Sequence, residues 1–167
     1  MSADLPTSRG FTFIELVITL ALVGLVSMLA LPLYEVSATR LKEAELRQAL
    51  RTIRSGLDAY KAATDSGALP RAIGESGYPP TLDVLTQSLD LAGQRDASGS
   101  LASRRMVILR QMPRDPFSND PKLPAAATWN TRSYAARSDD PQPGADVFDV
   151  SSRSTLIGLD GTAYATW

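Results

Sequence analysis

A long apolar stretch near the start of the chain runs directly into an amphipathic segment. Residues 11–33 are apolar apart from one acid, Glu15, and three hydroxyl residues. As an α-helix they would rise about 35 Å, enough to cross the hydrocarbon core of a bilayer. Strong helix formers with charges on most faces follow up to Asp65. We therefore predict one helix from Phe11 to about Asp65, with a membrane-spanning part at 11–34 and an amphipathic part at 35–66.

The amphipathic part carries a single apolar stripe. Its members are spaced 4, 3, 4 and 3 residues apart: Leu46, Leu50, Ile53, Leu57 and Tyr60. This spacing is typical of a helix face that packs on a core. A coiled-coil seam is a weaker interpretation, because the stripe holds only about two heptads. Gly67 then supplies a C-terminal stop for the helix.

Only short elements are predicted after the helix. Residues 67–80 are rich in Gly and Pro and indicate a loop, and residues 92–103 are small and polar and indicate another. The remaining predictions are a short helix at 81–91 with Leu82, Leu85 and Leu89 on one face, a strand or short helix at 106–112, and strands at 133–136, 147–151 and 163–167. A long helix packed on a small antiparallel sheet is an α+β fold, with residues 67–167 as its globular domain.

Composition narrows the function classes. The chain has 17 Lys and Arg against 18 Asp and Glu, a net charge of −1, which gives no basis for a nucleic-acid surface. It has no Cys and no His, so thiol chemistry, disulfides and the commonest general base are all missing. No nucleophile motif, phosphate loop or metal-ligand cluster stands out. The sequence favours a structural role that requires no cofactor over an enzymatic one.

The acid in the apolar stretch is the strongest functional signal. A charged side chain at mid-bilayer costs roughly 3 kcal/mol, so Glu15 is a candidate functional residue. Residues 1–10 are polar and lack an apolar core, which excludes a Sec-type signal within them. Arg9, just before the span, favours a cytoplasmic N-terminus.

The segment from Gly10 to Leu16, GFTFIEL, resembles the processing site of type IV pilins and of type II secretion pseudopilins. The resemblance implies that a prepilin peptidase cuts between Gly10 and Phe11, removes the leader 1–10 and methylates Phe11. It also implies that Glu15 acts in assembly and that Pro32 matches the helix proline of the family.

Later residues bring the resemblance closer to the major, G-type pseudopilin of type II secretion. They are MPRDPF at 112–117, Trp129 with Tyr134, and VFDVSS at 147–152. The family continues after the Asp-Pro pair with an aromatic residue and a glycine, whereas this chain continues with Phe117, Ser118 and Asn119. The resemblance is strongest over residues 9–34.

A pseudopilin of this kind would sit in the inner membrane as a single-pass protein with a cytoplasmic N-terminus and a periplasmic domain. The resemblance implies that it polymerises with itself and with minor pseudopilins, at an inner-membrane assembly platform, to drive protein export. One alternative is a type IV pilus subunit for adhesion, twitching or DNA uptake, although many such pilins carry a disulfide that this chain lacks. Another is a single-pass membrane-anchored binding domain.

Four residues of the predicted helix carry the assembly hypothesis: Phe11, Glu15, Gly24 and Pro32. Glu15 would neutralise the free amine of a neighbouring Phe11, because two charges that are each costly in lipid offset one another when paired. The alternative is an acid solvated near the membrane surface. Gly24 and Pro32 would let the helix unwind partly on entering a fibre, and the alternative is a tolerated membrane kink.

Four aspartates near the C-terminus are candidate calcium ligands: Asp139, Asp140, Asp146 and Asp149. The resemblance suggests calcium, and carboxylate oxygens suit that ion. The spacing matches no EF-hand, however, and the tail 152–167 departs from the family's calcium loop. A solvated acidic turn is therefore the favoured interpretation.

Overall fold

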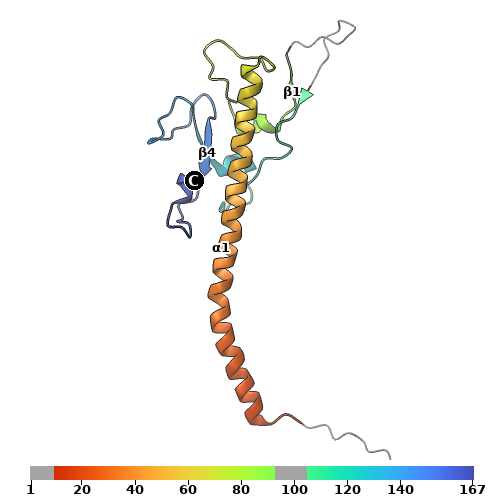
Figure 1. Ribbon diagram of the computed structural model, residues 1–167, viewed down its shortest axis with the longest axis vertical. Helices are drawn as coiled ribbons and strands as arrows, with labels where there is room; N and C mark the ends of the chain where they lie inside the picture. The colour runs from red at the N-terminus through yellow and green to blue at the C-terminus, as the bar shows by residue number, and fades with distance from the viewer. Residues whose placement is uncertain (1–9, 93–104) are drawn as a thin grey trace, which may run out of the picture. The chain divides into compact units, whose positions relative to one another are not determined.

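The computed structural model describes residues 10–92 and 105–167, without the side chains of 29–32. The chain forms two compact units, Met1–Arg40 and Leu41–Trp167 (Figure 1). The leader residues 1–9 and most of the loop expected at 92–103 lie outside the described residues.

One helix, α1 (Phe13–Asp65), belongs to both units and confirms the predicted long helix (Figure 1). It ends at the predicted glycine. Gly67 has a φ of +74°, a left-handed conformation that a glycine adopts without strain. Its N–H donates to the carbonyl of Thr64 at 3.0 Å, which closes the last turn of the helix.

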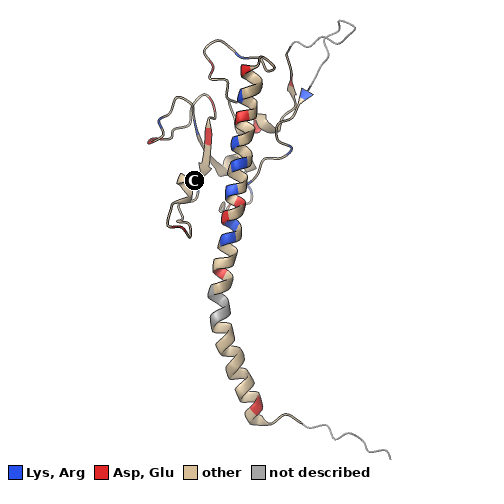
Figure 2. Ribbon diagram, viewed as in Figure 1, with Lys and Arg blue, Asp and Glu red and all other residues tan. Residues whose placement is uncertain are grey.

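The part of α1 in the first unit presents apolar side chains to the outside. Among the described residues, α1 is the one helix long and apolar enough to cross a membrane, and none of its most apolar window is buried in the chain. Phe13 and Leu25, for example, are exposed. Figure 2 shows an acid at the start of α1, and the other charged residues of the helix begin at Glu35. The first part therefore has the surface of a helix made for lipid or for other apolar helices.

The part of α1 in the second unit supplies the core of that unit. The predicted stripe is confirmed: Leu46, Leu50, Ile53 and Leu57 are buried, and Tyr60 packs against them half-buried. Burial of one such aliphatic side chain contributes about 1.5–3 kcal/mol. The stripe packs against side chains from the rest of the unit: Leu82, Leu85, Met112, Trp129, Val147, Val150 and Tyr164.

The strands form two separate antiparallel pairs in the described part of the chain. Strand β1 (Leu89–Asp90) pairs with β2 (Arg105–Met106), and β3 (Trp129–Arg132) pairs with β4 (Asp149–Ser152). In the second pair Trp129 lies opposite Ser152 and Arg132 opposite Asp149. The α+β fold class is confirmed, with a type IV pilin-like arrangement of a long N-terminal helix and small antiparallel sheets.

Two strand predictions are wrong. The strand expected at 133–136 lies earlier, at β3, because the carboxylate of Asp146 accepts the hydroxyl of Ser133 and the N–H of Tyr134 and turns the chain there. The segment 163–167 is a 3-10 helix, η3 (Tyr164–Thr166), preceded by a single bridge between Ala163 and Ile157.

The short elements between α1 and β3 also differ from expectation. The helix expected at 81–91 is a 3-10 helix, η1 (Leu82–Thr86), and Leu89 belongs to β1 instead. Of the segment 106–112, only Met106 is in a strand. The N–H of Leu109 donates to the carbonyl of Leu85 at 2.8 Å, outside either strand pair. A third 3-10 helix, η2 (Ala125–Thr128), leads into β3.

The strand predicted at 147–151 is confirmed as β4, which begins two residues later than predicted.

Candidate assembly site at the start of α1

The start of α1 is capped by its own sequence. The helix begins at Phe13, so Thr12 takes the N-cap position. The hydroxyl of Thr12 accepts the N–H of Glu15 at 3.3 Å, and its carbonyl accepts the N–H of Leu16 at 3.2 Å. A Thr at the N-cap with a Glu three residues later is the capping-box pattern. Sequence reasoning about an apolar span overlooked this cap, although the Thr-x-x-Glu spacing signals it.

The predicted processing site lies just before the cap. Gly10 and Phe11 precede α1, and both are exposed. A cut between them would leave a free amine one residue ahead of the N-cap. That amine would add a positive charge to the positive end of the helix dipole, which is unfavourable. An acid in the first turn opposes both charges, and Glu15 is that acid.

The carboxylate of Glu15 has no hydrogen bond or ion pair to residues 10–92 or 105–167. Other polar groups of the apolar half are satisfied within the helix: Thr19 donates to the carbonyl of Leu16 at 2.9 Å, and Ser27 to that of Val23 at 2.8 Å. Such internal hydrogen bonds let hydroxyls reside in lipid. Glu15 therefore differs from its polar neighbours, because its partner must come from outside the described chain.

Gly24 and Pro32 lie further along the same helix. A Cβ added to Gly24 would meet nothing within 4 Å, so the glycine relieves no crowding against the part of the chain that the structure describes. The helix continues through Pro32, so the proline does not end it. Any packing role of Gly24 therefore belongs to contacts with another molecule.

Residues 5–31 match the family model described as the prokaryotic N-terminal methylation motif. The chain thus carries a type IV pilin-like signal, and the match covers the processing site, the acid and most of the apolar segment. Such a motif implies processing by a prepilin peptidase and polymerisation with pilin-like subunits. The apolar part of α1 is consistent with membrane anchoring of a protein of this kind. No curated protein and no solved structure matches the chain.

The four C-terminal aspartates do not gather into one site. Among the described residues there is no cluster of three or more acids that could hold a metal ion. Asp139 pairs with Arg137 at 2.9 Å, and Asp140 accepts the amide of Gln142 at 2.7 Å. The hydrogen bond from Arg137 lowers the pKa of Asp139.

The other two aspartates bind donors in the folded unit. Asp149 forms ion pairs with Arg54 at 2.8 Å and with Arg132 at 3.2 Å. Asp146 accepts the Ser133 hydroxyl at 2.7 Å and the N–H of Tyr134 at 2.8 Å. Burial raises the pKa of Asp146, but hydrogen bonding with Ser76, Ser133 and the N–H of Tyr134 outweighs it and leaves the pKa below its ordinary value. Their carboxylates serve the fold of the C-terminal region.

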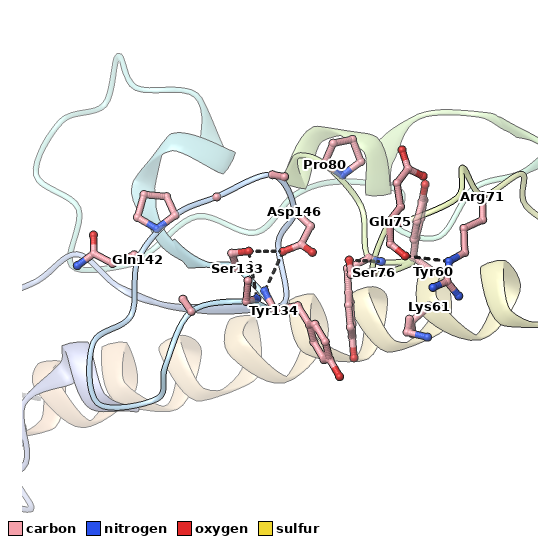
Figure 3. A pocket seen from close by; sticks show the side chains of 17 residues that line it. Tyr60, Lys61, Arg71, Glu75, Ser76, Pro80, Ser133, Tyr134, Gln142 and Asp146 are labelled. Carbon is pink, nitrogen blue, oxygen red and sulfur yellow. Dashed lines mark hydrogen bonds between the residues drawn. The ribbon is translucent and has the colours of Figure 1, made fainter.

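A cavity of about 1040 Å³ lies in the second unit between the end of α1 and the loops around residues 71–80 and 133–146 (Figure 3). Three tyrosines line it, Tyr60, Tyr78 and Tyr134, and the rings of Tyr78 and Tyr134 stack with their centroids 5.9 Å apart. Its charged side chains are engaged within the chain, as Lys61 is with Asp65. The cavity therefore has a mixed lining of tyrosines, polar side chains and charged side chains.

Two buried carboxylates in the second unit were not foreseen from the sequence. Asp115, in the turn of the MPRDPF segment, accepts the hydroxyl of Ser152 at 2.5 Å and the N–H of Phe117 at 2.8 Å. Glu43 accepts the N–H of Leu159 at 2.7 Å and the hydroxyl of Tyr164 at 3.0 Å. Glu43 lies three residues before Leu46, so it continues the buried stripe by one helical turn. This position in the stripe could have predicted from the sequence that Glu43 is buried.

Proposed function

We propose that this chain is a structural subunit of a type II secretion pseudopilus that polymerises through the first part of α1. The observation that carries the proposal is the carboxylate of Glu15, which lies in the first helical turn without a partner in the described chain. It lies directly behind a processing signal and within an apolar helix whose surface is exposed. A residue of that kind is costly in lipid unless another molecule pairs with it.

The proposed assembly follows from these charges. A prepilin peptidase removes residues 1–10 on the cytoplasmic side of the inner membrane, and the second unit lies in the periplasm. The new amine of Phe11 on one subunit then meets Glu15 of a neighbour. Each charge offsets the desolvation cost of the other, so subunits dock in the one register that pairs them. Copies of this chain and minor pseudopilins would join at an inner-membrane assembly platform.

The test compares Glu15→Leu with Glu35→Leu, which removes the next acid along the same helix. Both variants are expressed with the peptidase and the assembly machinery, and mature termini are read by mass spectrometry. We expect an N-methylated Phe11 in both variants and fibre formation only with Glu35→Leu. Fibres formed equally well by Glu15→Leu would refute the pairing of charges.

Deletion of the chain, measured alongside these two variants, addresses the alternatives. A type IV pilus subunit would give surface fibres by electron microscopy, and its deletion would leave protein export unchanged. A membrane-anchored binding domain would keep Met1, stay monomeric and tolerate Glu15→Leu. The proposal requires the opposite on each point: loss of exported protein on deletion, a terminus at Phe11, and sensitivity to the acid.

A further inference from the structure

The C-terminal segment contains a closed turn with a rigid backbone. Ile157 and Ala163 form a bridge across its base, and the N–H of Gly158 donates to the carbonyl of Thr162 at 2.8 Å. At the tip, Asp160 accepts both the N–H of Thr162 at 2.9 Å and its hydroxyl at 2.7 Å. The turn is therefore held by its own hydrogen bonds.

The turn is also fixed to the early part of α1 in the second unit (Figure 1). Glu43 accepts the N–H of Leu159, and Arg47 pairs with Asp160 at 3.5 Å. Arg47 also lies over the ring of Trp167, 4.1 Å from its centroid. Among the described residues, the side-chain hydrogen bonds that join α1 to later parts of this unit come from Glu43, Arg47 and Arg54, and Glu43 lies nearest to the apolar segment in sequence.

This hydrogen-bonded turn exposes three apolar side chains, beside the polar Asp160 and Thr162. Leu156 is 58% exposed, Ile157 is 68% exposed and Leu159 is 50% exposed. Singly scattered exposed apolar residues are ordinary, whereas these three lie within four residues of one another on a single turn. The one acid of the turn, Asp160, is paired with Arg47, which lowers the electrostatic penalty of bringing the turn to a lipid surface. We call residues 156–159 the apolar turn.

The chain itself brings a membrane within reach of the apolar turn. Ten residues separate Glu43 from Leu33, which ends the apolar stretch. Ten residues span at most about 36 Å when fully extended and about 15 Å as an α-helix. Interfacial headgroups occupy several ångströms of that distance. A tether this short keeps the turn at a high effective concentration near the bilayer. Lys42 is exposed next to Glu43 and can face anionic headgroups.

We propose that the apolar turn contacts the phospholipid interface of the membrane that the preceding segment spans. Leu156, Ile157 and Leu159 enter the interface while Glu43 and Arg47 hold the turn against α1. The contact fixes how the second unit lies on the membrane before the subunit joins a fibre. The inference rests on the membrane anchoring in the proposed function, but it requires neither polymerisation nor the charge pair of Glu15.

The test uses the absence of cysteine from the sequence, which makes any introduced cysteine a unique label site. Ile157→Cys in the full chain is labelled with an environment-sensitive fluorophore and reconstituted in phosphatidylglycerol–phosphatidylethanolamine vesicles, at about one protein per vesicle. Ile73→Cys is the matched control, because Ile73 is a fully exposed isoleucine in another loop of the same unit. Leu25→Cys, in the apolar segment, reports insertion of the span.

We expect a quencher attached to the lipid near the headgroup to reduce the emission of the label at 157 at least two-fold and to leave the label at 73 unchanged. Leu156→Ser with Leu159→Ser should restore most of the emission at 157, with unchanged thermal unfolding showing that the unit is still folded. A label at 157 that behaves like the one at 73, while the label at 25 is quenched, overturns the inference and leaves the anchoring intact.

Two further outcomes also overturn it. Protection at 157 that appears only at high protein density and is insensitive to the lipid quencher assigns the apolar turn to a contact between copies. A label at 25 that is not quenched shows that the span does not insert, which defeats the proposed function as well. This assay does not require fibre assembly. Failure of the membrane contact can therefore be distinguished from failure of the charge pair proposed for Glu15.

Discussion

The buried carboxylate of Glu43 allows the sharpest prediction about stability. It is 5% exposed and accepts two hydrogen bonds, from the N–H of Leu159 and from the hydroxyl of Tyr164. These bonds hold the C-terminal segment on α1. Glu43→Leu replaces the carboxylate with an apolar side chain of similar size, so it removes the acceptor without leaving a large cavity.

The cost follows from the donors that the substitution abandons. A hydrogen bond to a charged acceptor contributes about 1.5–3 kcal/mol, and a buried donor left unpaired costs about 1–3 kcal/mol. The hydroxyl of Tyr164 is buried, whereas the turn that carries Leu159 can admit water. We therefore expect Glu43→Leu to lower the free energy of unfolding by about 2–4 kcal/mol, which for a unit of this size is a fall in Tm of about 10 °C.

The assay is thermal and urea unfolding of the full chain in detergent, followed by tryptophan fluorescence. Glu45→Leu is the matched control, because Glu45 lies two residues away and is exposed. Tyr164→Phe alone should cost about 1 kcal/mol, and combining it with Glu43→Leu should cost less than the sum of the two. If Glu43→Leu unfolds within about 0.5 kcal/mol of Glu45→Leu, the carboxylate does not hold the segment.

Three other predictions test separate contacts. Arg54 donates to Asp149 and to the carbonyls of Val150 and Trp167, so Arg54→Lys should lower stability by about 1–2 kcal/mol, measured by urea unfolding, whereas the same change at exposed Arg51 should have no effect. Thr12→Val should speed amide exchange in the first turn of α1 several-fold, corresponding to about 1 kcal/mol, and a Ser there should retain the cap. Burial and the neighbouring carboxylate raise the pKa of Tyr164 to about 12. Folding therefore favours the protonated phenol. The free energy of unfolding should be highest below pH 10 and should fall by about 2 kcal/mol as the pH rises towards 12. Unfolding curves measured across this pH range should not show that loss in Tyr164→Phe.

The long helix and its buried stripe could be predicted because both depend on local pattern. The apolar stretch, the 4-3-4-3 spacing from Leu46 and the glycine at 67 each act within a few residues of the backbone they determine. The lone acid at Glu15 was equally visible, since any charge in such a stretch stands out. These features give the fold class and most of the candidate assembly site.

The strand positions and the buried acids could not be predicted, because contacts distant in sequence decide them. Ser133 and Tyr134 lie outside a strand and donate hydrogen bonds to the carboxylate of Asp146. Tyr164 begins a 3-10 helix, and its hydroxyl donates to the carboxylate of Glu43. A two-residue pair such as β1 with β2 carries too little pattern to be recognised in one sequence. Short strands of this kind depend on the helix face they cover rather than on their own propensity.

Glu15 and Glu43 lie on the same helix, yet they serve different levels of organisation. An acid in apolar surroundings must pair with a hydrogen-bond donor or a cation. If that partner lies in the same chain the acid stabilises the fold, and if it lies in another chain the acid stabilises the assembly. The donors of Glu43 lie later in its own chain, at Leu159 and Tyr164, whereas no described residue supplies one for Glu15. Replacing Glu43 should therefore lower the unfolding temperature of an isolated subunit, and replacing Glu15 should leave that temperature unchanged and abolish assembly. A Glu15→Leu subunit that unfolded earlier than the native chain would place the partner of Glu15 within its own molecule, and the case for a charge pair between subunits would be lost.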